Sequence, residues 1–293
     1  KVPITDDVIL ERDMRSNAVK ELQENLIRLG FGEWKPTTFF GSKTEGALKE
    51  FQSYHGLEAS GVYDRQTREK LESELEVSYF YGDGDAESLD IQNRLIKLGF
   101  GDWDPTIRFG PTTQKAVKAF QEYYPGLKVT GVLDSKTQER LKYETEERLH
   151  RGVRSDEVKA LQEELIRLGF GNWQSTTFYG STTEGAVKDF QRYYSLIVNG
   201  IYDSRTQEKL EEVGKLQLGP GLRRPDVKRY QETLMRLGFA DWTKATECFC
   251  SKTERATKEF QKYHVIPVTG VVDKVTENKM RAELEVSYFY GER

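Results

Sequence analysis

The chain has 293 residues, a formal net charge of −4 and a charged fraction of 31%. A nucleic-acid-binding protein usually carries a basic patch, and these totals give no sign of one. No run of the sequence reaches the roughly 18–20 apolar residues that a transmembrane helix needs. We therefore expect neither a nucleic-acid partner nor insertion into a membrane. The first residues lack the apolar core of a signal peptide, so we expect any secretion signal to lie outside this sequence.

One unit is repeated four times along the chain. The glutamines of a shared Leu-Gln step, which reads Ile-Gln or Tyr-Gln in two copies, lie 69, 70 and 69 residues apart. In each unit Leu-Gly-Phe, Phe-Gln-x-Tyr and Gly-x-x-Asp-x-x-Thr follow in this order, starting in the first unit at Leu29, Phe51 and Gly61. Such self-similarity predicts tandem modules. The predicted modules span residues 18–75, 87–144, 156–213 and 225–284. The joints are short enough for a close-packed array and long enough for a loose string.

Each module contains the signals of three helices. In the first, apolar residues recur at helical spacing over 19–29, and Gly30 is expected to end this helix. Ser42 and Glu45 are spaced as a capping box that would open a second helix, and the third and fourth modules repeat this spacing. Asp64 is expected to cap a short third helix. The sequence thus predicts an all-α fold, a tandem array of four small three-helix bundle modules.

The three motifs together resemble a known family. Leu-Gln-x-x-Leu-x-x-Leu-Gly-Phe, then aromatic-Gly-x-x-Thr-x-x-Ala-Val-x-x-Phe-Gln, then Gly-x-x-Asp-x-x-Thr is similar to the peptidoglycan-binding domain family of bacterial cell-wall hydrolases. The resemblance extends over all four modules. It implies a three-helix fold, a peptidoglycan partner and a location outside the cell at the wall. It also implies non-catalytic attachment, commonly beside an amidase, muramidase or peptidase domain in the same or another chain.

The fourth module departs most from this pattern. Cys250 replaces the glycine of the aromatic-Gly step, and the loop from Phe239 to Cys250 has one extra residue. Cys248 and Cys250 are the only cysteines of the sequence. One residue apart, they would make a poor disulfide and at most half of a metal site.

All four tryptophans occupy the same position, in the loop that follows Leu-Gly-Phe. An aromatic side chain there could stack on a sugar ring or a peptide, or it could fill a small core while its N–H finds a partner. Both interpretations remain open. The residues are Trp34, Trp103, Trp173 and Trp242.

Three further positions are candidate ligand contacts. The tyrosine of Phe-Gln-x-Tyr could pack its ring and offer its hydroxyl to a groove; it is Tyr54, Tyr123, Tyr193 and Tyr263. The glutamine beside it could bind the amides of a stem peptide or hold a loop in place; it is Gln52, Gln121, Gln191 and Gln261. Arg28, in the last turn of the first helix, could clamp a carboxylate or interact with the helix C-terminus.

The three histidines argue against a catalytic centre. His55 and His264 share a position that holds Tyr124 and Tyr194 in the other modules, and a general base could not be exchanged for tyrosine in this way. His150 lies in a joint. No His-Glu-x-x-His motif, nucleophile elbow or glycine-rich phosphate loop occurs. We expect a protein that is not an enzyme and holds no cofactor and no metal.

Tandem copies of a weak site on a repeating polymer raise avidity by roughly 10²–10⁴. With the partner that the resemblance implies, the repeat predicts multivalent binding to peptidoglycan, through its glycan or its stem peptide. The alternatives are a structural or protein-interaction array on the cell surface, and the targeting region of a larger wall hydrolase. A solvent-facing Trp34 beside Tyr54 would favour a ligand groove, and a buried pair would favour the structural array.

One nonapeptide, ELEVSYFYG, occurs both at 74–82 and at 283–291. After the first module this segment leads into the second. We therefore expect further modules to follow the fourth.

Overall fold

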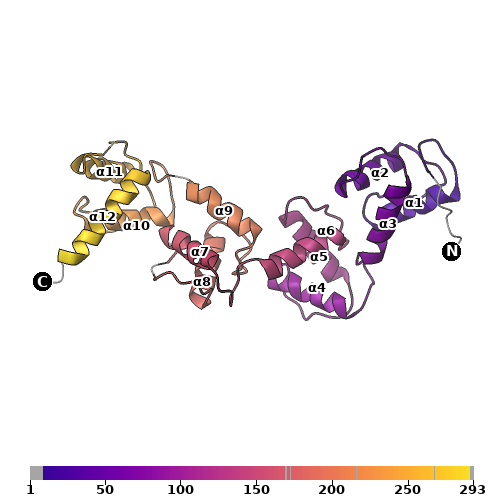
Figure 1. Ribbon diagram of the computed structural model, residues 1–293, viewed down its shortest axis with the longest axis horizontal. Coiled ribbons are helices and arrows are strands. Elements are labelled where there is room, and N and C mark those ends of the chain that lie inside the picture. The colour runs from indigo at the N-terminus through magenta and orange to yellow at the C-terminus, as the bar shows by residue number, and fades with distance from the viewer. Residues whose placement is uncertain (1–8, 169, 172, 216, 267, 291–293) are drawn as a thin grey trace. The chain divides into compact units, whose positions relative to one another are not determined.

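The computed structural model describes residues 9–290, except 169, 172, 216 and 267. Over these residues every element of regular secondary structure longer than a single bridge is a helix, so the predicted all-α fold is confirmed (Figure 1). The chain divides into two compact units, residues 1–147 and 148–293, which are described separately. Within the described part, no helix has both the length and the apolar composition to cross a membrane.

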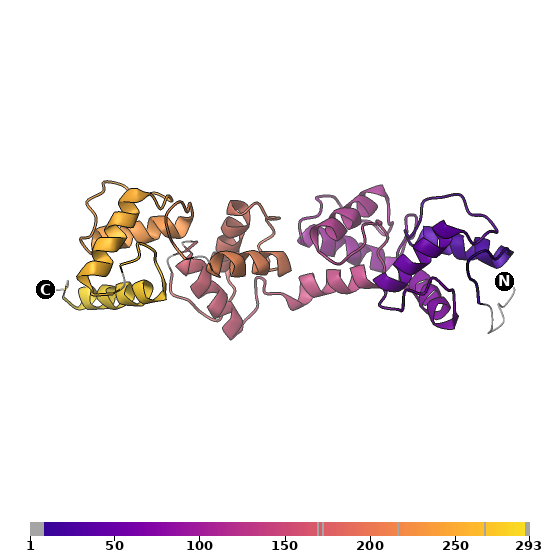
Figure 2. The same ribbon diagram turned by 90° about the horizontal axis from the view of Figure 1, so that it is seen from above.

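Each unit contains two groups of three helices, seen from a second direction in Figure 2. The first unit contains α1 (Asn17–Arg28), α2 (Ser42–Tyr54) and α3 (Arg65–Val77), then α4 (Ala86–Lys97), α5 (Pro111–Tyr123) and α6 (Ser135–Lys142), with the π-helical turn η1 (Tyr143–Glu147). The second unit contains α7 (Asp156–Arg167), α8 (Ser181–Tyr193) and α9 (Ser204–Lys215), then α10 (Pro225–Arg236), α11 (Ser251–Tyr263) and α12 (Lys274–Tyr290). We call the four groups the first to fourth modules.

Aspartate caps the third helix of every module, as predicted. The side chain of Asp64 accepts a hydrogen bond of 2.8 Å from the backbone N–H of Thr67, one of the donors that the helix start leaves without a partner. Asp134, Asp203 and Asp273 make the same bond. The helix stop is confirmed as well, because Gly30 has a positive φ of 85°, which glycine adopts at little cost.

The predicted capping box at the second helix is wrong. Gly41, in extended conformation, is the N-cap of α2, so Ser42 is already the first helical residue and its side chain makes no cap. Glu45 forms an ion pair of 2.7 Å with Lys49 instead. The helices that start at Ser181 and Ser251 follow the same pattern. In the second module, Pro111 is the first residue of the second helix.

An extended segment precedes the first helix of each module and is tied to that module's loops. In the first module, Leu10 pairs with Tyr63 and Arg15 pairs with Phe39 through isolated antiparallel bridges. The equivalent pairs are Tyr79–Leu133 and Gly84–Arg108, Leu149–Tyr202 and Arg154–Phe178, and Leu218–Val272 and Arg223–Cys248. These segments fall between the predicted modules, whose limits stay a prediction.

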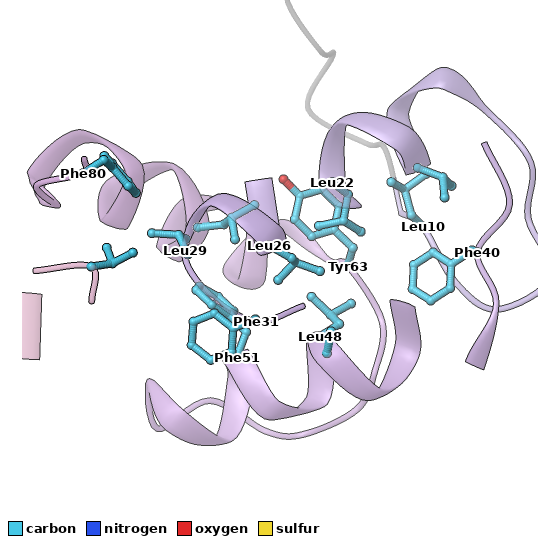
Figure 3. Packing of buried hydrophobic residues seen from close by; sticks show 14 residues of the cluster. Leu10, Leu22, Leu26, Leu29, Phe31, Phe40, Leu48, Phe51, Tyr63 and Phe80 are labelled. Atoms are coloured by element: carbon cyan, nitrogen blue, oxygen red, sulfur yellow. The ribbon is translucent and has the colours of Figure 1, made fainter. Parts of the chain in front are cut away.

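The core of the first module is small and rich in aromatic rings (Figure 3). Leu26 of α1, Leu48 and Phe51 of α2, and Phe40 of the intervening loop are fully buried. The ring of Phe31 meets that of Phe51 edge to face at 5.2 Å, a favoured arrangement of aromatic pairs. The helices of the first module therefore close on one compact cluster.

Neighbouring modules are in contact inside each unit. In the first unit, the side chain of Ser135 donates a hydrogen bond of 2.6 Å to Glu74. In the second unit, Arg224 donates one of 2.7 Å to the carbonyl of Val213. Of the two arrangements compatible with the sequence, a close-packed pair is the one found within each unit.

Candidate functional site

The loop between the first and second helices holds the tryptophan of each module against the core. In the first module Trp34 is half-buried and lies over the backbone of Gly32. A Cβ atom added at Gly32 would come within 1.9 Å of the indole ring, so only glycine allows the ring to lie there. Gly101 and Gly171 give Trp103 and Trp173 the same room. The tryptophans thus both fill the module and remain partly accessible.

A buried glutamine of the first helix holds this loop in place through hydrogen bonds. Gln23 donates hydrogen bonds of 2.8 Å to the carbonyl of Phe39 and to the hydroxyl of Thr44, and it accepts one of 2.7 Å from the backbone N–H of Thr37. Its equivalent in the second module, Gln92, also accepts a hydrogen bond from the indole N–H of Trp103 at 3.1 Å. This glutamine was not among the predicted ligand contacts, although its presence in all four copies was a sequence signal of this anchoring role.

The glutamines predicted as ligand contacts have the same kind of role in the next loop. Gln52 is buried and donates to the carbonyl of Val62 and the hydroxyl of Thr67, both at 3.0 Å, while it accepts from the N–H of Gly61 at 2.9 Å. Gln121, Gln191 and Gln261 repeat these bonds. Because both ends of the amide are used inside the module, we leave these residues out of the candidate binding surface.

Two of the predicted tyrosines lie where a module meets the next one. The hydroxyl of Tyr54 accepts a hydrogen bond of 3.4 Å from the backbone N–H of Lys128, and that of Tyr193 donates one of 3.1 Å to the carbonyl of Arg223. The ring contacts of Tyr54 are with Phe31 and a histidine, at 5.7 and 4.9 Å, and not with Trp34. The structure therefore does not bring Trp34 and Tyr54 into one aromatic platform.

The other two predicted tyrosines differ in their exposure. Tyr123 is half-buried against Phe100, with ring centroids 5.7 Å apart, whereas Tyr263 of the fourth module is 73% exposed. Arg28 is exposed, and its guanidinium lies 4.1 Å from the ring centroid of Phe80, a cation–π contact with the connector to the second module. Its predicted role as a carboxylate clamp stays a prediction.

The loop of the fourth module encloses a hollow of about 400 Å³ beside its tryptophan. Ala240 stands here in place of the glycine of the other modules, where an added Cβ atom would overlap the indole ring. The hollow combines the aromatic ring of Trp242 with the cations Lys244 and Lys252. Gln231, Asp241, Thr243, Thr246, Cys250 and Thr253 complete its lining. An aromatic wall beside two ammonium groups suits a ligand with an apolar face and an anionic group.

The thiol of Cys250 lies at the N-terminus of α11. A hydrogen bond from the backbone N–H of Thr253, with others from the same helix start, lowers the pKa of the Cys250 thiol. Cys248 and Cys250 are both free thiols. Among the residues that the structure describes, no three histidine, cysteine or acidic side chains come together as metal ligands.

The histidines of the first and fourth modules face a glutamate of the third helix. His55 Nδ1 lies 3.5 Å from Glu74 Oε1, and His264 Nδ1 lies 3.5 Å from Glu283 Oε1. Burial lowers the pKa of His55 to about 4 and also lowers that of His264, although the neighbouring carboxylates act in the opposite direction. His55 therefore takes a packed position between the second and third helices.

Four tandem three-helix modules, each with an anchored aromatic loop, define this class of protein. The sequence profile of the peptidoglycan binding domain family matches residues 15–71, 85–141, 154–210 and 223–280. These matches extend over more than half of the sequence, and the chain belongs to this family.

Two curated relatives are amidases. The chain is 26% identical over 165 residues to N-acetylmuramoyl-L-alanine amidase CwlL of Bacillus licheniformis, a match to 47% of this chain and 46% of that protein. It is 24% identical over 206 residues to a second Bacillus licheniformis protein named a probable N-acetylmuramoyl-L-alanine amidase, a match to 69% of this chain and 44% of that protein. The chain thus spans less than half the length of each amidase.

One solved structure is also similar in part. It is a peptidoglycan-binding protein from Clostridioides difficile in complex with glutamine hydroxamate. It shares 32% sequence identity over 23% of this chain and 42% of that chain, with a TM-score of 0.22.

Proposed function

We propose that the chain binds bacterial peptidoglycan at the cell wall through its tandem modules and does not cleave it. The observation that carries this proposal is the fourfold match to a family of binding domains, which leaves little of the chain for any other domain. The half-buried tryptophan in the loop of every module supports it, because such a ring offers an apolar surface for a sugar or a peptide. Peptidoglycan repeats its chemistry along the polymer, so several modules of one chain can bind it at the same time.

The modules do not contribute equally in this proposal. The loop of the fourth module has a hollow that combines Trp242 with Lys244 and Lys252. Peptidoglycan stem peptides carry carboxylates, which two ammonium groups can bind. In the other modules the indole ring lies on a glycine, and the expected contact is flatter and weaker.

A catalytic partner completes the proposal. Both curated relatives are named as amidases, and each is more than twice as long as the stretch that matches this chain. We infer that the array serves to hold a wall hydrolase of amidase type on its substrate, in the same chain or in another. The array raises the local concentration of such an enzyme at the wall.

Retention on purified peptidoglycan tests the binding proposal. We expect the variant with Trp34, Trp103, Trp173 and Trp242 all replaced by alanine to lose about 10²-fold or more in affinity, because each replacement weakens one contact of a multivalent complex. Tyr81→Ala is the matched control, because Tyr81 is 61% exposed and lies in a connector. Circular dichroism reports whether each variant remains folded. Equal retention of the folded quadruple variant and the control contradicts the proposal, and so does release of soluble fragments from peptidoglycan by the chain alone.

A second candidate is an array that binds other proteins. It is favoured by Tyr54 and Tyr193, whose hydroxyl groups are hydrogen-bonded to the neighbouring module. The same retention experiment separates the two, because an array of this kind would not sediment with peptidoglycan.

A further inference from the structure

The C-terminal half of α3 in the first module contacts the second module. The carboxylate of Glu74 is fully buried and accepts two hydrogen bonds from Ser135, one of 3.1 Å from its N–H and one of 2.6 Å from its hydroxyl. Gln138 donates a bond of 2.6 Å to the carbonyl of Val77. Beyond α3 the backbone of Tyr79 pairs with that of Leu133. The start of α6 therefore rests on the end of α3.

Two lysines of the second module complete this contact at the end of α2. The ammonium group of Lys136 lies 4.5 Å from the ring centroid of Tyr54 and also donates to its carbonyl. Lys128 forms an ion pair with Glu50 and donates its backbone N–H to the hydroxyl of Tyr54. We call Glu50, Tyr54, His55 and Glu74 the acceptor set, and Lys128, Ser135 and Lys136 the donor set.

The fourth module repeats the acceptor set at the same positions. Glu259, Tyr263, His264 and Glu283 correspond to Glu50, Tyr54, His55 and Glu74. The internal geometry is also the same, because the histidine lies 3.5 Å from the glutamate in both modules. A lysine one turn earlier pairs with this glutamate in each case, Lys70 at 2.5 Å and Lys279 at 3.1 Å.

The two faces differ in what covers them. Tyr54 is half-buried under the second module, whereas Tyr263 is 73% exposed. The carboxylate side chain of Glu74 is 0% exposed, whereas that of Glu283 is 33% exposed. The residue after His264, Val265, is 92% exposed. The acceptor face of the fourth module is thus assembled in the same way as that of the first and is open.

The nonapeptide shared by the two modules has two backbone conformations. After the first module, α3 ends at Val77, Ser78 is extended and Tyr79 pairs with Leu133. After the fourth module, the same sequence continues as helix in α12 up to Tyr290. The same local sequence is therefore compatible with both forms, and the extended form is the one that pairs with the second module.

A second copy of this chain is a poor occupant for the open face. Its first module would offer Arg65 where the second module has Ser135, and Glu58 where the second module has Lys128. Glu58 would then face Glu259, at the place where Lys128 pairs with Glu50 in the first two modules. Two negative charges side by side repel each other. The third module departs on the acceptor side, since Val213 replaces the glutamate.

We propose that the open face of Glu259, Tyr263, His264 and Glu283 is a docking site for a further module of this family that carries the donor set of the second module. Such a module has serine and lysine at the start of its third helix and a lysine in the loop before it. It joins through the segment that follows Glu283, and its docking converts Ser287 and Tyr288 from helix to the extended, paired form of Ser78 and Tyr79. This inference concerns assembly of the array and is independent of peptidoglycan binding.

An extension of the full chain tests the proposal. Residues 83–147 are appended after Gly291, where the identical nonapeptide makes the new joint the same as the natural one. We expect oxidative labelling of Tyr263 to fall several-fold, to the level of Tyr54. We also expect the Cα chemical shifts of Ser287 and Tyr288 to change from helical to extended values.

The matched control carries the same extension with Lys128→Glu, Ser135→Ala and Lys136→Glu in the appended copy, so that all three members of its donor set are replaced. It should leave Tyr263 labelled as in the unextended chain. If the intact extension leaves Tyr263 and the helical shifts unchanged, the proposal is overturned. Hydrogen exchange shows whether the appended module is folded. An appended module whose amides are all unprotected also overturns the proposal, because the second module is folded after the same connector.

Discussion

The first and fourth modules have one fold built from different side chains. In the first module two buried leucines, Leu22 and Leu48, lie at positions that the fourth fills with Tyr230 and Thr257. There the hydroxyl of Tyr230 donates a hydrogen bond of 2.9 Å to that of Thr257, which in turn donates to the carbonyl of Thr253. A buried polar pair thus replaces an apolar contact and leaves no hydroxyl without a partner.

The loops of the two modules differ in the same compensated way. Gly32 lets Trp34 lie on the backbone, whereas Ala240 excludes this position and a hollow lies beside Trp242. The comparison teaches that the anchoring glutamines fix the fold of the module while the residues around the tryptophan are free to change. Four predictions test this division, from the largest expected effect to the smallest.

Replacing the shared anchor should harm both modules alike. We expect Gln52→Leu and Gln261→Leu each to lower the free energy of unfolding of its module by about 3 kcal/mol or more, because two or more buried polar groups lose their partners. Urea denaturation, monitored in each module by hydrogen exchange, measures the loss of stability. A much smaller loss in either module would contradict the role of this glutamine as a common anchor.

Exchanging the loop residues should have opposite consequences in the two modules. We expect Gly32→Ala to destabilise the first module by about 2 kcal/mol, since the new methyl group overlaps the indole ring. Ala240→Gly should instead let Trp242 move onto the backbone. Tryptophan fluorescence then shifts to the red for Gly32→Ala and to the blue for Ala240→Gly, and identical spectra before and after exchange would contradict the comparison.

The buried histidine should make the first module sensitive to acid. The pKa of His55 is about 4 in the folded protein and about 6.5 in an unfolded chain, so between these values the unfolded state binds more protons. Stability therefore falls as the pH falls, by about 1–2 kcal/mol between pH 7 and pH 5. His55→Tyr, which copies the second and third modules, should remove this dependence. Unfolding measured at both pH values checks it, and an unchanged slope in His55→Tyr would contradict it.

A single strained residue distinguishes the two modules at the end of the second helix. Val265 has a φ of +54°, whereas the equivalent position in the first module holds Gly56 at +75°. A β-branched residue is unfavourable there, and we expect Val265→Gly to stabilise the fourth module by about 1 kcal/mol. Gly56→Val is the reciprocal variant and should destabilise the first module. Thermal unfolding monitored for each module separates the two signs.

Much of the fold was predictable because it depends on local sequence. The spacing of apolar residues, Gly30 and Asp64 identify the helices, and four copies of the same signal remove most ambiguity. The capping box was wrong because the extended backbone of Gly41, which no spacing rule reveals, places the helix start one residue earlier.

The candidate site was less predictable because it depends on contacts between distant residues. The role of Gln52 is set by a loop about ten residues away, and that of Tyr54 by Lys128 in another module. The repeated sequence does not indicate which residues make contacts between modules. The tryptophans remain compatible with both predicted roles, core filling and ligand contact, because their rings are half-buried.

The bridges that precede each first helix have a mechanical consequence. The chain enters the second module at Tyr79, which is bonded directly to Leu133 just ahead of the last helix. Tension applied along the polypeptide passes through this pair into α6 and onward, so α4 and α5 lie outside the loaded path. A module that is pulled apart at its two ends can thus keep its aromatic loop unstrained.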